Sequence, residues 1–307
     1  MRDKNENSLR VSSIHPYRYR SLVHALTFLT LTLTSMGCDD ERLPSSEIKV
    51  IELSSLIDET ITNDRSWSTQ CLAWSAPNTL WQTSGSVNGS LLIKRDLVLG
   101  SVESWPLNQL FAEGCTLWRQ WLLVLTWRSF ALLVIDPLSG LEVKRFTIGT
   151  EGWGMSYSAR GLLYSDGSST LRWIDEDSLS SAIEESELSP QRELTPLIEI
   201  TKELNMYERE HPLFQLNELE WVEEFIFANV YPESEIVVIH AQTGQVIAKL
   251  DLTSLMTDEE NRSTAFIGVS NGVAYDVLRD RLWFTGKRWH SIYGASASRV
   301  LNRLRQR

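Results

Sequence analysis

A strand pattern that recurs about every 40 residues is the feature that most constrains how this chain can fold. A short apolar strand ending in a polar or aromatic group occurs five times, and a second apolar strand follows four of these. Asp96, Asp136 and Asp175 close three of the second strands, at spacings of 40 and 39 residues. Turn-forming sequences such as DPLSG and AQTG come next, as expected between antiparallel strands. Such repeats are typical of the four-stranded blades of a β-propeller.

We therefore predict an all-β fold, a five-bladed β-propeller over residues 67–295. Residues 38–66 would form an N-terminal linker and first strand region, and residues 296–307 a basic C-terminal tail. A partly helical acidic insertion at about 180–215 would separate blades three and four as a solvated excursion, with its helix at 201–210. In a propeller the innermost strands line a central channel, so residues at equivalent repeat positions converge although they are distant in sequence.

Residues 1–37 differ from the rest of the chain and are predicted to be a signal peptide. A basic leader precedes the apolar run LVHALTFLTLTLTSMGC, which is too short and Thr-rich for a typical transmembrane span. The ending SMGC resembles a bacterial lipobox, which implies lipidation of Cys38. Secretion without a lipid and an uncleaved anchoring helix are the alternatives. All three place the folded part outside the cytoplasm, in the periplasm or at the cell surface.

Charge and motif content exclude several classes of function. Removal of residues 1–37, which hold five basic and two acidic side chains, changes the formal net charge from −11 to −14. Such an acidic protein is a poor partner for nucleic acid, whose binding depends on phosphate neutralisation. His211, His240 and His290 lie far apart, so no metal site is predicted. Neither G-x-S-x-G nor a phosphate-binding glycine loop is present. We expect a monomer that meets the membrane only through a lipid anchor.

Polar-aromatic clusters precede the predicted hairpins, and together with nearby strand ends they would surround one cavity. Ordinary propeller loops rarely combine so many Trp side chains with Glu and Asn. The motifs are, in order, STQCL, FAEGCT, LTW, EGWGM, SDGSS, LNELEW, ANVY, NGVAYD and TGKRW. The series resembles the plant and bacterial glutaminyl-peptide cyclotransferases, also called glutamine cyclotransferases. These are five-bladed propellers that convert an N-terminal glutamine to pyroglutamate with loss of ammonia. The matches cover nearly the whole predicted mature chain.

The resemblance implies roles for eight side chains. Glu113 in FAEGCT matches the acid that the family uses in catalysis, and it would carry a proton from the attacking amine to the departing ammonia. The implied substrate-binding residues are Gln70, Phe111, Trp127, Trp153, Asn217, Tyr231 and Lys287. Considered without the resemblance, Glu113 is more simply a turn or strand-cap residue, and Lys287 an exposed one. Likewise, Trp127 and Trp153 would be core residues, and Asn217 a turn former.

Three positions depart from the family pattern. Ser68 stands where the family has Phe, Tyr231 where it has Trp, and His290 where it has Pro. The first two departures remove aromatic surface from the expected pocket, and they bear on substrate preference and on activity itself.

The implied partners are peptides or proteins with an N-terminal glutamine, and no cofactor is expected for catalysis. A structural calcium ion held by loop carboxylates is compatible with the sequence. The main alternative is a non-catalytic propeller that binds peptides or scaffolds a periplasmic or surface assembly, because propellers host many functions. A calcium-dependent propeller hydrolase or lactonase would need several acids and Asn residues on the channel wall, where only Glu113 and Asn217 fit easily.

Only two cysteines follow Cys38, and they occupy equivalent positions in adjacent predicted blades. Cys71 lies beside Gln70, and Cys115 lies two residues after Glu113. In an oxidising compartment such a pair favours a disulfide, which would fasten the first blade to the second at the pocket. Two buried apolar thiols are the alternative. A Cα separation above about 7 Å would exclude the disulfide without movement of the backbone.

Overall fold

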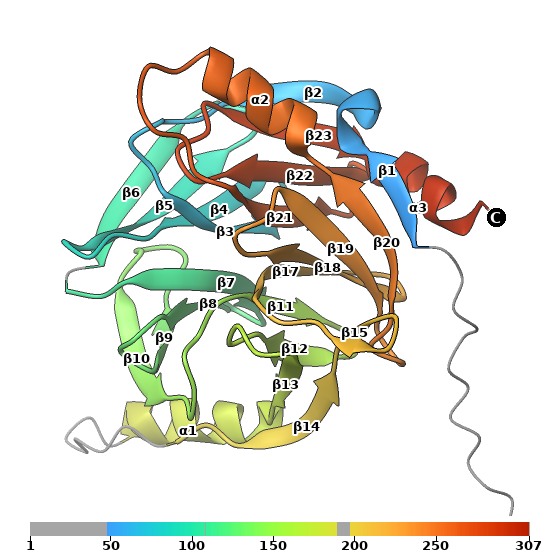
Figure 1. Cartoon of the computed structure of the whole chain (residues 1–307). Helices are drawn as coiled ribbons and strands as arrows, with labels where there is room; N and C mark the ends of the chain where they lie inside the picture. Colours follow the sequence, from blue (N-terminus) through green and yellow to red (C-terminus); the bar gives the residue numbers. More distant parts are fainter. Residues whose placement is uncertain (1–47, 108, 189–196, 307) are drawn as a thin grey trace, which may run out of the picture. The chain divides into compact units, whose positions relative to one another are not determined.

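The computed structural model describes residues 48–107, 109–188 and 197–306. The predicted signal peptide and the lipidation site Cys38 lie outside these residues, so both stay predictions. The described part folds into five sheets of four or five strands, arranged as the blades of a propeller (Figure 1). The predicted all-β, five-bladed architecture is therefore confirmed. Within this part of the chain, no helix has the length and apolar character needed to cross a membrane.

Each blade is an antiparallel sheet whose strands follow one another from the channel outward. Blade one contains β3 (Thr69–Ser75), β4 (Thr79–Ser84), β5 (Ser90–Asp96) and β6 (Val102–Leu107). Blade two contains β7 (Ala112–Trp118), β8 (Trp121–Thr126), β9 (Ala131–Ile135) and β10 (Glu142–Thr147). Blade three contains β11 (Met155–Ser158), β12 (Gly161–Tyr164), β13 (Thr170–Ile174) and β14 (Ile200–Asn205). Blade four contains β17 (Leu216–Val222), β18 (Phe225–Val230), β19 (Glu235–His240) and β20 (Val246–Asp251). Blade five begins with β21 (Ser270–Asp276), β22 (Arg281–Gly286) and β23 (Ser291–Ser296).

The N-terminal segment completes the last two blades. Strand β2 (Ile57–Thr62) pairs antiparallel with β23 and becomes the outermost strand of blade five. Strand β1 (Lys49–Glu52) pairs parallel with β20 as a fifth strand of blade four. The short 3₁₀ helix η1 (Leu53–Leu56) joins them and buries both of its Leu side chains. Because a free sheet edge exposes unpaired backbone groups, these pairings both cover edges and close the ring.

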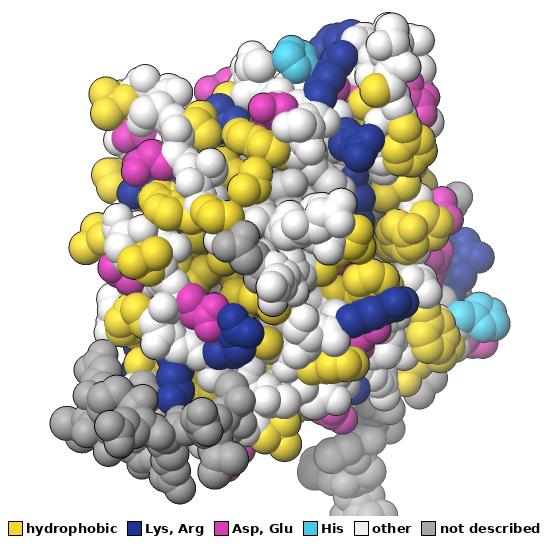
Figure 2. All heavy atoms as spheres, turned by 90° about the vertical axis from the view of Figure 1, so that its left-hand side faces the viewer, with side chains coloured by type: hydrophobic (Ala, Val, Ile, Leu, Met, Phe, Trp, Pro, Cys, Tyr) yellow, Lys and Arg dark blue, Asp and Glu magenta, His cyan; other side chains and the backbone are white. Residues whose placement is uncertain are grey.

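The outermost strands are more exposed than the others because the inner strands of each blade are sandwiched between neighbouring blades. Every residue of β9 is buried, whereas in β10 only Phe146 is buried. A strand covered on both faces favours a continuous apolar sequence such as ALLVI, and an outer strand favours alternation with charged residues, as in EVKRFT. Figure 2 shows hydrophobic and charged side chains interspersed on the side of the molecule that carries the outer strands of blades one and two. The innermost strands β3, β7, β11, β17 and β21 contact one another in sequence around the ring.

The predicted helix at 201–210 was wrong. Residues Ile200–Asn205 form β14, and the helix lies earlier, at α1 (Glu176–Leu188), inside blade three between β13 and β14. Two cross-strand contacts favour the strand: Arg172 pairs with Glu203 at 3.2 Å, and the Lys202 ammonium lies 4.5 Å from the Trp173 ring centroid. Such pairs, together with the open edge of β13, outweigh local helix propensity. Between blades three and four lies only the small hairpin β15 (Tyr207–Glu208) and β16 (His211–Pro212).

Two further helices pack on the propeller. Helix α2 (Thr253–Asn261) follows blade four and carries Glu259, whose fully buried carboxylate accepts bonds from the Tyr293 hydroxyl at 2.7 Å and the His290 backbone N–H at 2.6 Å. Helix α3 (Ala297–Arg305) occupies the predicted basic tail, and the Ser296 hydroxyl caps its first turn by accepting the Arg299 N–H. Arg305 at its end pairs with Glu224 at 2.9 Å.

Candidate active site

The candidate site is built where the innermost strands carry an extra residue. The polar-aromatic clusters were expected to precede the hairpins, but four of them form the innermost strands themselves. In β3, β7, β17 and β21 the pairing register shifts by one residue near the start of the strand. The shifts fall at Thr69/Cys71, Ala112/Cys115, Leu216/Leu219 and Ser270/Val273. A bulge of this kind turns a side chain away from its regular direction. The four bulged segments hold Gln70, Glu113, Asn217 and Asn271.

All eight side chains predicted from the family motifs line one cavity of about 230 Å³. They are Gln70, Phe111, Glu113, Trp127, Trp153, Asn217, Tyr231 and Lys287. Blades one, two, four and five each supply at least one of these side chains, and blade three adds Trp153, which lies two residues before β11. The structure thus brings the predicted residues together, while the chemical role of each stays a prediction.

Two glycines allow the innermost strands to approach closely enough for this convergence. A Cβ on Gly154 would lie 2.0 Å from the backbone oxygen of Asn217, and one on Gly114 would lie 2.6 Å from Gly154. Such contacts exclude any side chain at either position. Gly114 also donates its N–H to the Trp153 carbonyl at 2.7 Å, and the Ser165 hydroxyl donates to the Asn217 carbonyl at 2.7 Å. These bonds fix blades two, three and four relative to one another beside the cavity.

Among the described residues that line the cavity, Glu113 is the only acidic one. Its side chain is nearly buried, and the Thr83 hydroxyl holds its backbone carbonyl at 2.6 Å. Burial raises the pKa of Glu113 from 4.5 to about 8, because a carboxylate loses its hydration in this position. The Lys287 ammonium opposes the rise, and the Glu151 carboxylate adds to it. The group is therefore poised to bind and release a proton near neutral pH.

Lys287 brings the opposite charge to the same cavity. Burial lowers its pKa, since the ammonium is also poorly hydrated there, and the Glu113 carboxylate opposes that fall. Its Nζ lies 5.2 Å from the centroid of the Tyr231 ring. A backbone bridge between Ser68 and Lys287 joins the first and fifth blades at this point.

The aromatic walls form two edge-to-face pairs. Phe111 and Trp127 have ring centroids 5.4 Å apart, and Trp153 and Tyr231 have centroids 6.4 Å apart. Tyr231 therefore keeps an aromatic surface on the wall at the position where the family pattern has Trp. Such pairs combine apolar area with a preferred geometry, which suits a pocket that holds a flexible substrate in one conformation.

Sequence reasoning missed Asn271. Its side-chain amide donates to the Gln70 Oε1 at 2.9 Å and to the Thr69 carbonyl at 3.3 Å, and it is fully buried. Because the oxygen end of the Gln70 amide accepts this bond, the NH₂ end is turned away from Asn271. The repeat contained the signal, since Asn271 in NGVAYD occupies the bulge position that Gln70, Glu113 and Asn217 occupy in other blades.

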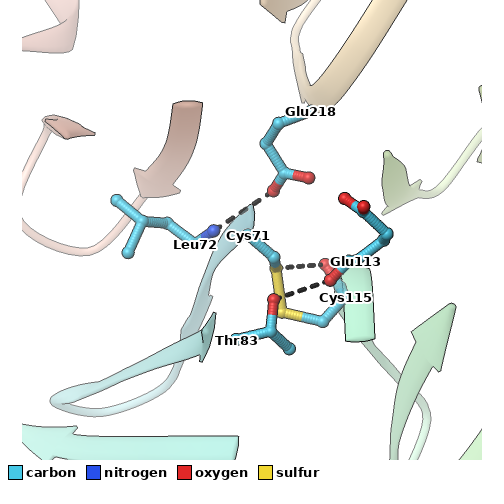
Figure 3. The surroundings of a disulfide bond; sticks show 6 residues. All are labelled: Cys71, Leu72, Thr83, Glu113, Cys115 and Glu218. Atoms are coloured by element: carbon cyan, nitrogen blue, oxygen red, sulfur yellow. Dashed lines mark hydrogen bonds between the residues drawn. A yellow bond between two sulfur atoms is a disulfide. The ribbon is translucent and has the colours of Figure 1, made fainter. Parts of the chain in front are cut away.

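A second buried carboxyl group lies next to Asn217 in β17. Glu218 is fully buried, and its Oε1 accepts the backbone N–H of Leu72 in blade one at 3.2 Å. Burial raises its pKa well above the usual range, and the charges of Glu220 and Glu113 add to the rise. Figure 3 shows the carboxyl groups of Glu113 and Glu218 on the same side of the neighbouring disulfide.

The disulfide joins Cys71 of β3 to Cys115 of β7, with a Cα separation of 5.7 Å (Figure 3). It links the two bulged strands directly beside Gln70 and Glu113. Among the described residues no cluster of three or more His, Cys, Asp or Glu side chains is arranged to hold a metal ion. The expectation of a structural calcium ion stays a prediction.

The departure at His290 has a structural explanation. Its backbone N–H donates to the buried carboxylate of Glu259. Proline, which the family pattern has at this position, lacks the N–H and could not make this bond. His290 therefore anchors α2 to blade five, outside the pocket lining.

A sequence model described as glutamine cyclotransferase matches residues 27–296. The chain belongs to this family. A glutaminyl-peptide cyclotransferase from Arabidopsis thaliana is 28% identical over 228 residues, which is 73% of this chain. The match spans 65% of the plant protein, slightly less than two thirds of its length. The crystal structure of Myxococcus xanthus glutaminyl cyclase superposes with a TM-score of 0.66 at 22% identity, over 78% of this chain and 94% of the bacterial one. This likeness supports the fold that family membership implies.

Proposed function

We propose that this protein is a glutaminyl-peptide cyclotransferase that converts the N-terminal glutamine of peptides or proteins to pyroglutamate and releases ammonia. The observation that carries the proposal is Glu113, a buried carboxyl group whose pKa burial raises to about 8, inside a cavity walled by aromatic rings. Membership of the glutamine cyclotransferase family supports the same reaction.

In the proposed reaction the neutral α-amine of the substrate attacks the carbon of its own side-chain amide. The α-amine has a pKa of about 8, so a large share is protonated at neutral pH. As the new C–N bond forms, the Glu113 carboxylate accepts a proton from the amine nitrogen. It then donates this proton to the amide nitrogen, the old C–N bond breaks, and ammonia leaves. A pKa near 8 suits both transfers, because the group accepts and returns a proton with little free-energy difference.

The carbonyl oxygen gains negative charge during the attack and needs a donor. Gln70, Asn217 and Lys287 carry side-chain N–H groups in the cavity lining, whereas the indole N–H groups of the two Trp residues donate to Glu151. The bond from Asn271 to the Gln70 Oε1 favours Gln70 as one donor, since it leaves the NH₂ end to face elsewhere. Lys287 adds a positive charge, which would stabilise the oxyanion through the low-dielectric pocket.

The aromatic walls would hold the substrate side chain folded back toward its own amine. Cyclisation is intramolecular, so the enzyme gains by selecting the compact conformer in which the two reacting atoms meet. The aromatic faces can also bind the protonated amine of the substrate, or the released ammonium ion, by cation–π attraction. We further propose that the protein acts outside the cytoplasm after export, with Cys38 as a lipid anchor.

The experiment measures ammonia release from a glutamine-initiated dipeptide, with Glu113→Gln as the paired variant. The proposal expects turnover by the wild type and none by Glu113→Gln, while both keep the same circular dichroism spectrum. A wild type that binds the peptide without releasing ammonia would point instead to a non-catalytic peptide-binding propeller. A fully active Glu113→Gln would remove Glu113 from the mechanism.

A further inference from the structure

One carboxylate oxygen holds both tryptophans of the candidate site. The Oε2 atom of Glu151 accepts the indole N–H of Trp127 at 2.9 Å and the indole N–H of Trp153 at 3.0 Å. The two rings come from different blades, since Trp127 follows β8 and Trp153 precedes β11. Hydrogen bonds to a charged acceptor are roughly twice as strong as bonds between neutral groups. Glu151 therefore fixes the distance and the relative orientation of the two indoles.

The two indoles sit in the middle of a continuous arc around the cavity. Trp127 packs edge-on against Phe111, and Trp153 packs edge-on against Tyr231, whose ring lies beneath the Lys287 ammonium. Between Trp127 and Trp153 the connection is the Glu151 carboxylate. Without this carboxylate no side-chain hydrogen bond would connect the two indoles.

The backbone of Glu151 is itself fixed. The next residue, Gly152, donates its N–H to the Thr126 carbonyl at 3.1 Å, and the Thr150 hydroxyl donates to the Glu151 carbonyl at 3.1 Å. The second carboxylate oxygen, Oε1, faces Arg128, whose Nε lies 3.9 Å away and whose guanidinium stacks on Trp127 at 3.9 Å from the ring centroid. Arg128 is largely exposed, so this ion pair contributes little compared with the two indole bonds.

We propose that Glu151 is a positioning residue of the cyclisation reaction, which holds Trp127 and Trp153 as one rigid wall against the substrate. This inference rests on the proposed function, and it assigns Glu151 no contact with the reacting atoms. The reaction requires the substrate to be folded back on itself, and a wall that loosens by about 1 Å can lower the rate by about 100-fold.

The geometry suggests a discriminating pair of variants. Glu151→Ala removes both hydrogen bonds. Glu151→Gln retains a carbonyl oxygen, and because both indoles donate to a single oxygen in the wild type, that oxygen can accept both N–H groups again. We expect Glu151→Ala to lower kcat/KM about 100-fold. The kcat/KM of Glu151→Gln should be at least about tenfold higher than that of Glu151→Ala. Removal of the negative charge should also shift the acidic limb of the kcat/KM profile of Glu151→Gln to lower pH, since Glu151 raises the pKa of Glu113.

A matched control exists elsewhere in the chain. The Glu176 carboxylate in α1 accepts the indole N–H of Trp118 at 2.8 Å, outside the cavity lining. Glu176→Ala therefore removes a carboxylate–indole bond of the same kind, and its kcat/KM should stay within about threefold of the wild type, as for substitutions away from the site. Thermal unfolding of both Ala variants measures how far a general loss of stability contributes.

The indole N–H resonances provide a readout that does not depend on activity. The signals of Trp127 and Trp153 are assigned with Trp127→Phe and Trp153→Phe, and both should move in Glu151→Ala and return toward their wild-type positions in Glu151→Gln. Unchanged resonances in Glu151→Ala, or wild-type kcat/KM in that variant, would overturn the inference. Glu151→Gln as inactive as Glu151→Ala would also overturn it, because positioning alone would then not explain the role. A wild type without cyclase activity would refute the proposed function, while the resonances would still decide whether Glu151 holds the indoles.

Discussion

Replacement of Glu113 by Gln should stabilise the fold at alkaline pH and leave it nearly unchanged at acidic pH. The folded state binds a proton at Glu113 up to about pH 8, whereas the unfolded chain releases it near 4.5. Between these values the folded state holds more protons, so the stability of the wild type falls as pH rises. Gln does not titrate, so the variant does not lose stability in this way as the pH rises. The difference between the two proteins should therefore grow through this interval and level off above pH 8.

The size of the effect follows from the shift. One pKa unit corresponds to about 1.4 kcal/mol, so the rise of Glu113 from 4.5 to about 8 corresponds to at most about 5 kcal/mol at pH 9. The shift already includes the attraction between Glu113 and Lys287, which the variant loses. We therefore expect the free energy of unfolding of Glu113→Gln to exceed that of the wild type by about 2–5 kcal/mol at pH 9. The Glu113 charge also raises the pKa of Glu218, so its loss in Glu113→Gln lowers the Glu218 pKa and changes the stability in the same direction at alkaline pH.

Urea unfolding of wild type and Glu113→Gln at pH 5 and pH 9, with the disulfide kept oxidised, measures this difference directly. The expected result is a small difference between the midpoints at pH 5 and a clearly higher midpoint for Glu113→Gln at pH 9. An equal difference at both pH values would refute the reasoning, because it would mean that the Glu113 carboxyl ionises normally in the folded protein. The measurement tests the electrostatics of the pocket without any assumption about the substrate.

Three further predictions concern the disulfide, the contact between α2 and blade five, and Lys287 of the pocket. Joint replacement of Cys71 and Cys115 by Ser should lower the free energy of unfolding by about 2–4 kcal/mol, measured in urea against the oxidised wild type, and no loss would contradict the disulfide. His290→Pro should lower it by about 1–3 kcal/mol, because a buried carboxylate of α2 loses its N–H donor, whereas His290→Ala keeps this donor and should be near neutral. Lys287→Met should move the acidic limb of kcat/KM to higher pH, since Lys287 holds down the pKa of Glu113. A limb that stays in place or moves to lower pH would show that the two charges do not interact.

The residues of the pocket could be predicted because the resemblance to the family implied them, and the repeat explains why they meet in one cavity. Positions about 40 residues apart in sequence occupy the same place in successive blades, and the motifs gave each position a residue type. The repeat does not predict strands that come from outside it and complete a blade. Nothing in the sequence of β1 and β2 indicates that they complete blades four and five, because an outer strand is selected by the open edge it covers.

Local sequence patterns gave one wrong prediction and left the bulges of the inner strands unpredicted. Residues Ile200–Asn205 resemble a helix by composition, but their pairing with β13 is decided by contacts to Arg172 and Trp173 that no local pattern contains. The bulges were also invisible, because a sequence shows a polar residue at the start of a strand but not the shift in register that aims it into the channel. This shift in register decides whether a side chain follows the regular alternation of the strand or points into the pocket.

The disulfide lies where the strands are least well held by their own ladders. A bulge leaves backbone groups out of the regular pairing, and both β3 and β7 carry one at the point where Gln70 and Glu113 turn into the cavity. Burying a carboxyl group such as Glu113 at that point adds a further free-energy cost, which rises with pH. The Cys71–Cys115 bond joins the same two segments covalently, one residue after Gln70 and two after Glu113. It therefore stabilises the pair of strands whose regular hydrogen bonding is interrupted to form the pocket.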